Sequence, residues 1–337
     1  MTLHLTEPRT GGAPAHSPES RKPGSRKPGP RKSRRGSRPG GSSIDVQRKK
    51  LLIPFVGPAF VLYTVLFIVP ALGAVWISLH KWAGSGPMKF VGLDNYGRIF
   101  RDQLFLSSFG NTLLLLFVVG TAIFVLAFAL TLVLRDMAGK KIARNVIFFP
   151  HLINALVFGV LAGFIFNPGG MVNSLLAPLG VTDPPKWLAQ DNIFPLIMVT
   201  LVCTTTGYFT TILMAGVDRI PPYYYEDCAL AGASAFQRLR YVILPLTWDV
   251  FGTCAVLWTI SSVKIFEIVW VFGGSSGAGV PPTQSWTAAV YTYVNAFSGQ
   301  STPAYGAATA SAVLSLALIS VLVVLLRRAM RRDAVEF

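Results

Sequence analysis

Six long apolar stretches constrain this sequence more than any other feature. They lie at about residues 53–79, 109–134, 143–166, 193–217, 246–272 and 307–327. A helix needs roughly 20 mostly apolar residues to cross a bilayer, and each stretch is about that long or longer. Only 13% of the residues are charged, which is too few for a soluble domain of 337 residues. We therefore predict an all-α, polytopic membrane protein with six transmembrane helices.

The first 50 residues have a different composition, typified by "RKPGSRKPGPRKSRRGSRPGG". They are rich in Pro, Gly, Ser and Arg and have almost nothing to bury, so we expect residues 1–50 to form a disordered basic tail and residues 51–337 the membrane domain. A basic tail can bind nucleic acid, but beside a membrane span attraction to anionic lipid is the favoured interpretation. Membrane lipid is therefore an expected partner, and nucleic acid is not.

The distribution of positive charge predicts the orientation. If the tail is placed in the cytoplasm, the segments on its side carry 24 of the 30 Lys and Arg residues, and the opposite segments carry five. Because Lys and Arg are retained on the cytoplasmic side, this bias predicts that both termini of a multi-pass plasma-membrane protein are cytoplasmic. On the outer side, the run "SWTAAVYTYVNAF" is expected to form an amphipathic helix.

The link between the fourth and fifth apolar stretches, "YYYEDCALAGASAFQRLRYVILPL", is cytoplasmic in this orientation. Residues 223–231 and 234–242 suit two short helices, with Ser234 as the N-cap of the second. Gly232 between them allows a bend, and Pro245 marks the join to the fifth span. Two helices too short to cross the membrane are expected to lie beside it and to offer a surface to another protein.

The acidic residues of this link are Glu226 and Asp227. We expect them in the first turn of the first short helix, where a negative charge offsets the helix dipole.

Two charged residues lie within the fifth stretch, where ionisable groups are costly and usually functional. Lys264 and Glu267 are three residues apart, so on one helix they share a face. They are expected either to line a translocation path or to brace neighbouring helices. A self-contained, ion-coupled secondary transporter that uses this pair is the alternative function.

Small polar residues recur through the fourth stretch at Thr200, Thr204, Gly207 and Thr211. Such a stripe favours close helix packing, but it also offers hydroxyl groups to a sugar, so Thr204 and Thr211 are candidate path residues. Asn154, which follows Pro150 in the third stretch, is another.

Several motifs of enzymes are missing from the sequence. There is no GxxxxGK[ST] phosphate-binding loop and no GxSxG nucleophile motif. The four histidines have no metal-ligand spacing, and the three cysteines suggest no disulfide framework. We expect neither a catalytic residue nor a metal site in this chain.

The link also carries a spacing of residues that identifies a family. Five residues separate Glu226 from Gly232, nine separate Gly232 from Val242, and one separates Val242 from the pair Leu244-Pro245. This spacing resembles that of the EAA loop of binding-protein-dependent ABC importer permeases. The closer likeness is to their carbohydrate-uptake branch, of the maltose and glycerol-phosphate type. Five other segments resemble the same branch, so the likeness covers about residues 51–328. These segments are "FVGLDNYGRIF", "NTLLLL", "NPGGMVNSLL", "KIFEIVWVFGG" and "YGAATASAVLSL".

The resemblance implies a type I ABC importer permease fold with a coupling loop at about 219–245. It implies that this subunit imports a di- or oligosaccharide by alternating access and is not an enzyme. The implied partners are a second permease subunit, two cytoplasmic subunits that bind ATP-Mg, and an extracytoplasmic solute-binding protein. No cofactor is implied for this chain itself.

Within the loop, the resemblance implies that Glu226 meets the ATPase, that Gly232 forms the bend, and that Leu244 and Pro245 seat the loop against the fifth span. The remaining implied coupling residues are Asp227, Ala229 and Ala233.

Overall fold

A computed structural model describes residues 54–135, 137–181, 183–274, 279–297 and 304–330. The predicted tail at 1–50 lies outside these residues. The chain divides into two units, Met1–Val61 and Leu62–Phe337. Of the first unit only residues 54–61 are described, and they are helical. All contacts given below lie within the second unit.

Four helices are long and apolar enough to span a membrane. They are Pro54–Ser78, Gln103–Arg135, Ile193–Val217 and Tyr305–Ala329. Within the first, a π-helical turn, η1 (Thr64–Ile68), precedes α2 (Val69–Ser78). The second consists of α4 (Gln103–Leu114), the π-helical turn η2 (Leu115–Val119) and α5 (Gly120–Arg135). The other two are α9 and α16. Four of the predicted spans are confirmed.

The third predicted span is not one continuous helix. α6 (Lys140–Leu152) and α7 (Ala155–Ile165) meet at 90°. The predicted span over 143–166 is therefore bent, because Ile153 is extended and the Asn154 side chain caps α7 by accepting a hydrogen bond from the Leu156 amide at 2.8 Å.

The fifth predicted span is broken twice. The segment Ala235–Leu246 is bent by 71° from α13 (Trp248–Val263), and α14 (Glu267–Gly274) follows after three residues. The predicted span over 246–272 is therefore not one continuous helix. If each bent pair is counted as one span, the described residues contain up to six.

The remaining elements are short. On the side of the chain predicted to be extracytoplasmic they are β1 (His80–Lys81) and β2 (Lys89–Phe90), which pair antiparallel, α3 (Asp94–Ile99), α8 (Met171–Leu176), η3 (Ala177–Leu179), η5 (Thr283–Ser285) and α15 (Ala288–Phe297). The link contains α10 (Pro222–Leu230), α11 (Ala235–Arg238), the π-helical turn η4 (Leu239–Ile243) and α12 (Leu244–Leu246). The helix predicted within "SWTAAVYTYVNAF" is confirmed as α15.

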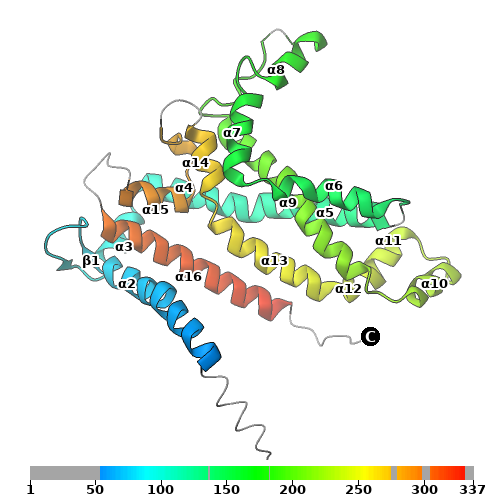
Figure 1. Cartoon of the computed structure of the whole chain (residues 1–337), viewed down its shortest axis with the longest axis horizontal. Coiled ribbons are helices and arrows are strands. Elements are labelled where there is room, and N and C mark those ends of the chain that lie inside the picture. The colour runs from blue at the N-terminus through cyan, green and yellow to red at the C-terminus, as the bar shows by residue number, and fades with distance from the viewer. Residues whose placement is uncertain (1–53, 136, 182, 275–278, 298–303, 331–337) are drawn as a thin grey trace, which may run out of the picture. The chain divides into compact units, whose positions relative to one another are not determined.

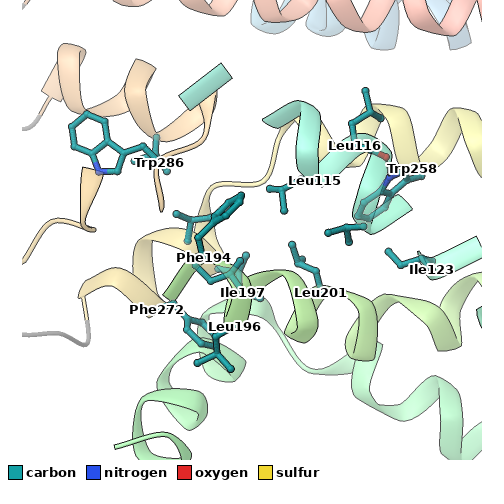
Figure 2. Packing of buried hydrophobic residues seen from close by; sticks show 14 of the residues in the cluster. Leu115, Leu116, Ile123, Phe194, Leu196, Ile197, Leu201, Trp258, Phe272 and Trp286 are labelled. Carbon is teal, nitrogen blue, oxygen red and sulfur yellow. Dashed lines mark hydrogen bonds between the residues drawn. The ribbon is translucent and has the colours of Figure 1, made fainter. Parts of the chain in front are cut away.

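The helices of the second unit pack around α9, α13 and α16 (Figure 1). α9 contacts α5, α6 and α13, while α16 contacts α2, α13 and α15. Figure 2 shows the apolar core where α9 meets η2 and α13, with the Trp258 indole beside Leu116. That indole Nε1 donates to the Leu116 carbonyl oxygen at 2.9 Å, which satisfies an acceptor in the π-helical turn.

α9 and α6 approach each other closely at Gly207. A Cβ atom built on Gly207 would overlap the carbonyl oxygen of Ile147 in α6. Only glycine permits this approach, so this part of the small polar stripe serves helix packing.

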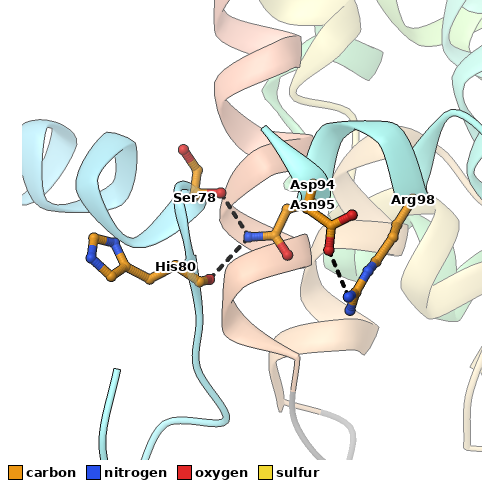
Figure 3. A network of polar contacts seen from close by, with 5 residues as sticks. All are labelled: Ser78, His80, Asp94, Asn95 and Arg98. Carbon is orange, nitrogen blue, oxygen red and sulfur yellow. Dashed lines mark hydrogen bonds and ion pairs between the residues drawn. The ribbon is translucent and has the colours of Figure 1, made fainter. Parts of the chain in front are cut away.

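A polar network holds the C-terminal end of α2 (Figure 3). The buried Asn95 amide donates to the carbonyl oxygens of Ser78 and His80, at 2.7 and 2.9 Å. One side chain thereby satisfies two acceptors at the C-terminus of α2. The ion pair between Arg98 and Asp94, at 2.6 Å, lies on the exposed side of the same short helix, α3.

Candidate translocation cavity and coupling elbow

The break between α6 and α7 and the break between α13 and α14 line one cavity of about 550 Å³. Its walls include Ile153 and Asn154 from the first break, the segment Lys264–Ile268 from the second, and Thr204 of α9. Irregular backbone at membrane depth is tolerated where it faces a cavity, because water or a solute can satisfy its polar groups. The cavity therefore accounts for the irregular backbone at the two helix breaks.

Four of the five predicted path residues meet in this cavity. Asn154, Thr204, Lys264 and Glu267 all line it. Thr211 does not line it. Its hydroxyl is buried and has no hydrogen-bond partner in the described part of the chain. The stripe on α9 is therefore divided between the cavity at Thr204 and helix packing farther along.

Lys264 and Glu267 do not share one helical face. α13 ends before Lys264 and α14 begins at Glu267, so the expected pairing three residues apart on a helix was wrong. Both side chains are exposed, and within the described ranges no ion pair joins them. Since an unpaired charge at membrane depth is costly unless it meets water or a ligand, both groups are expected to face the cavity contents.

Sequence reasoning missed the aromatic part of the wall. Phe266 lines the cavity between the two charged residues. Its ring stacks on Trp270 with centroids 5.4 Å apart, and both rings contact Tyr293 of α15. The alternation of charged and aromatic residues in "KIFEIVW" was the available signal. Trp258 does not belong to this wall, because its side chain is buried in the core.

The segment around η5 holds the second break in place. The fully buried Thr287 hydroxyl donates to the Ile265 carbonyl oxygen at 2.8 Å. The same segment is tied to α4, where the Asn111 amide donates to the carbonyl oxygens of Gln284 and Trp286, at 2.7 and 2.9 Å. These bonds connect the second span to the cavity wall.

The link between α9 and α13, here called the elbow (Pro222–Leu246), has the predicted pair of short helices. Gly232 has φ +65°, which gives the bend between them. Ser234 caps α11 in a capping box, in which its hydroxyl accepts from the Gln237 amide at 3.3 Å and the Gln237 side chain accepts from the Ser234 amide at 2.8 Å. The predicted N-cap is confirmed.

The acidic residues of the elbow lie one turn later than expected. α10 begins at Pro222, which suits a helix start because proline lacks an amide hydrogen. Glu226 and Asp227 therefore lie in the second turn, and the prediction that they occupy the first was wrong.

The base of the elbow is anchored to the membrane helices. Ile243 is fully buried against Val217 and Ile220, and the Arg135 guanidinium lies 3.4 Å from the centroid of the Tyr225 ring. Leu244 is half-buried and Pro245 is exposed. The residue that seats the elbow most deeply is thus Ile243, which sequence reasoning missed.

The outer face of the elbow is exposed and partly apolar. Leu230 is 88% exposed, Phe236 72% and Tyr241 74%. Glu226, Asp227 and Ala229 are exposed as well, whereas Ala233 is half-buried. Large apolar side chains beside charged ones on an exposed surface are typical of a docking site for another protein.

Comparison with known proteins decides the family. Residues 107–334 match the binding-protein-dependent transport system inner membrane component family. The chain belongs to this family. It is accordingly a multi-pass protein of the plasma membrane, as its apolar helices indicate. The predicted family is confirmed.

The relatives of this permease include several named for carbohydrates. The trehalose/maltose transport system permease protein MalF of Thermococcus litoralis is 30% identical over 282 residues, which cover 82% of this chain and 92% of the relative. The diacetylchitobiose uptake system permease protein NgcF of Streptomyces coelicolor is 25% identical, with 84% and 83% covered. These similarities confirm the resemblance to the carbohydrate-uptake branch.

A solved structure supports the fold. A bacterial ABC transporter that imports alginate superposes with a TM-score of 0.73 at 20% identity, covering 86% of this chain and 98% of that one. The ABC importer permease fold predicted from the sequence is thereby confirmed.

Proposed function

We propose that this chain is one permease subunit of an ATP-driven importer for a di- or oligosaccharide. Its relatives named for trehalose, maltose and diacetylchitobiose support a sugar as the solute. The chain itself hydrolyses no ATP and holds no cofactor. Two separate cytoplasmic subunits bind ATP-Mg, and a second permease subunit completes the membrane pathway.

The cavity at the two helix breaks is the observation that carries this proposal. Its side chains offer donors and acceptors of several kinds, because Lys264 donates, Glu267 accepts, and Asn154 and Thr204 have groups of both kinds. Sugar hydroxyls both donate and accept, and Phe266 adds an apolar surface. A concave site with a few polar groups and an aromatic wall suits a small polar solute.

The elbow is the proposed receiver of force. Its exposed Leu230 and Tyr241 contact the ATPase subunits, and its buried Ile243 passes the movement to the membrane helices. Alternating access then opens the cavity first to one side and then to the other. Both termini are cytoplasmic in this arrangement.

On the opposite side of the membrane, a solute-binding protein delivers the sugar. The family description names binding-protein-dependent transport, and one solved alginate transporter is in complex with a periplasmic protein that holds an alginate pentasaccharide.

Site-directed crosslinking tests the coupling. In a full transporter whose native cysteines are replaced, Leu230→Cys should crosslink to the ATPase subunit. Met137→Cys is the control, since Met137 is also exposed, at 42%, but lies outside the elbow. Crosslinks from both positions alike, or from neither, would contradict the proposed contact.

Uptake in vesicles tests the energy source. Labelled maltose or trehalose, presented with the purified binding protein, should enter only when ATP is supplied on the elbow side. The ion-coupled alternative makes the opposite prediction, namely uptake that persists without ATP while a proton gradient is intact.

A further inference from the structure

An apolar groove of about 560 Å³ separates α5 from the elbow. One wall is formed by α5, with Phe124, Val125 and Phe128 among its residues. The other is formed by the elbow, including Phe236, Leu239 and Leu244, together with Phe251 of α13. All the lining residues are apolar except Thr121 and Arg240.

The length of the groove matches one leaflet of a bilayer. Its α5 wall runs from Thr121 to Leu132, which is about 16 Å at 1.5 Å per residue. Half of a hydrocarbon core of about 30 Å is about 15 Å. The Leu132 end lies beside the elbow, where Leu132 and Leu239 pack on the same small cluster. The groove therefore extends from the elbow towards the middle of the membrane.

Arg240 provides a charge at the rim of this groove. Its side chain is exposed, and in the part of the chain that the structure describes no carboxylate forms an ion pair with it. A guanidinium group binds phosphate with several parallel hydrogen bonds. A basic residue at the cytoplasmic end of an apolar groove between membrane helices is the arrangement that anionic lipid head groups favour.

We propose that this groove binds one anionic phospholipid of the cytoplasmic leaflet, with an acyl chain along α5 and the phosphate at Arg240. Such a lipid touches the second span on one side and the elbow on the other. Its presence limits how far the elbow moves independently of α5, so lipid composition regulates coupling. This regulatory part rests on the proposed function, whereas the binding part does not.

Lipid retention tests the binding part. The full-length chain, purified together with its partner subunits in mild detergent, is titrated with phosphatidylglycerol or with phosphatidylcholine and examined by native mass spectrometry. One phosphatidylglycerol should be retained in preference to phosphatidylcholine. Arg240→Gln should weaken this retention roughly fivefold, because one basic residue is lost.

Two further variants make the test specific. Arg328→Gln, at the cytoplasmic end of α16 and outside the groove, removes the same charge and should retain lipid normally. Ala129→Trp, on the α5 wall, fills the groove and should abolish retention. Equal retention of both lipids, or normal retention by Arg240→Gln, overturns the proposal. A Val125→Cys crosslink to the second permease subunit overturns it too, because a protein segment would then occupy the groove.

Uptake in vesicles tests the regulatory part. ATP-driven uptake by the unaltered transporter should rise when phosphatidylglycerol is added to phosphatidylcholine vesicles, and uptake by Ala129→Trp should not respond. If both respond equally, the regulatory part is wrong. If neither transports any sugar, the proposed function fails, while the retention result still decides whether the lipid site exists.

Discussion

The bend at Gly232 gives the sharpest test of the elbow. Gly232 has φ +65°, and a Cβ atom added there would meet nothing within 4 Å. Steric overlap therefore contributes nothing to the cost of a substitution, and only the backbone conformation matters. A residue other than glycine pays about 1–2 kcal/mol in the left-handed region, and asparagine pays less. A change of that size lowers the population of the bent elbow by a factor of roughly 5–30.

We expect sugar uptake to fall in the order glycine, asparagine, alanine, valine at position 232. Asparagine tolerates the left-handed conformation, and a β-branched residue is least compatible with it. Gly139 supplies a matched control, because it has φ +87° and open space around it but lies outside the elbow. Gly139→Ala carries a similar backbone cost and should leave coupling intact.

The assay compares ATP-driven uptake with the amount of transporter in the same vesicles. Gly232→Asp or Gly232→Arg should remain in the membrane and abolish transport. Comparison of Gly232→Asn with Gly232→Asp then separates the backbone cost from the effect of a charge on the docking surface. Uptake by Gly232→Ala equal to that of glycine would refute the reasoning, as would an asparagine variant no better than valine.

Three further predictions concern the cavity and its supports. Thr287→Val leaves the Ile265 carbonyl without its donor, so it should destabilise the protein by about 1–3 kcal/mol in thermal unfolding and weaken uptake. Thr287→Ser should restore both stability and uptake. Unchanged stability and uptake in Thr287→Val would contradict this. Lys264→Met and Glu267→Gln should raise the half-saturating sugar concentration for uptake with little change in unfolding temperature, because both side chains are exposed on the cavity; the reverse pattern would mean that they brace helices. Gly207→Leu should reduce the yield of folded protein in gel filtration, because overpacking at a close helix contact costs about 1–3 kcal/mol or more; a normal yield would show that α6 and α9 are farther apart.

The sequence predicts the spans well where apolar length alone decides them. Pro54–Ser78, Ile193–Val217 and Tyr305–Ala329 lie within a few residues of their expected bounds. The two short helices of the elbow were predictable as well, because Gly232 and Ser234 act through local backbone chemistry. The bend at Gly232 and the cap at Ser234 depend on neighbouring residues only, so they can be predicted without knowing which distant segments they contact.

The helix breaks were not predictable from apolar length, because both lie inside apolar runs. α6 continues through Pro150 to Leu152, and the chain turns at Asn154. The break after Val263 is held by Thr287, which lies 22 residues after Ile265 and donates to the Ile265 carbonyl oxygen. A sequence pattern restricted to one stretch cannot contain this information. Lys264 and Glu267 were therefore predicted as path residues, but the helix break between them was not predicted.

The elbow and the cavity are joined by one unbroken helix. α13 begins two residues after the elbow ends at Leu246 and finishes directly before Lys264, so it extends about 24 Å between the two sites. At its far end, the cavity wall is fixed to α4 through Thr287 and the segment that Asn111 holds. In the proposed mechanism, a displacement of the elbow therefore reaches the cavity as a movement of the single helix α13 against a braced wall. Because irregular backbone at the far end of that helix is stable only while it faces a polar cavity, such a movement changes the surroundings of Lys264 more than those of the buried core.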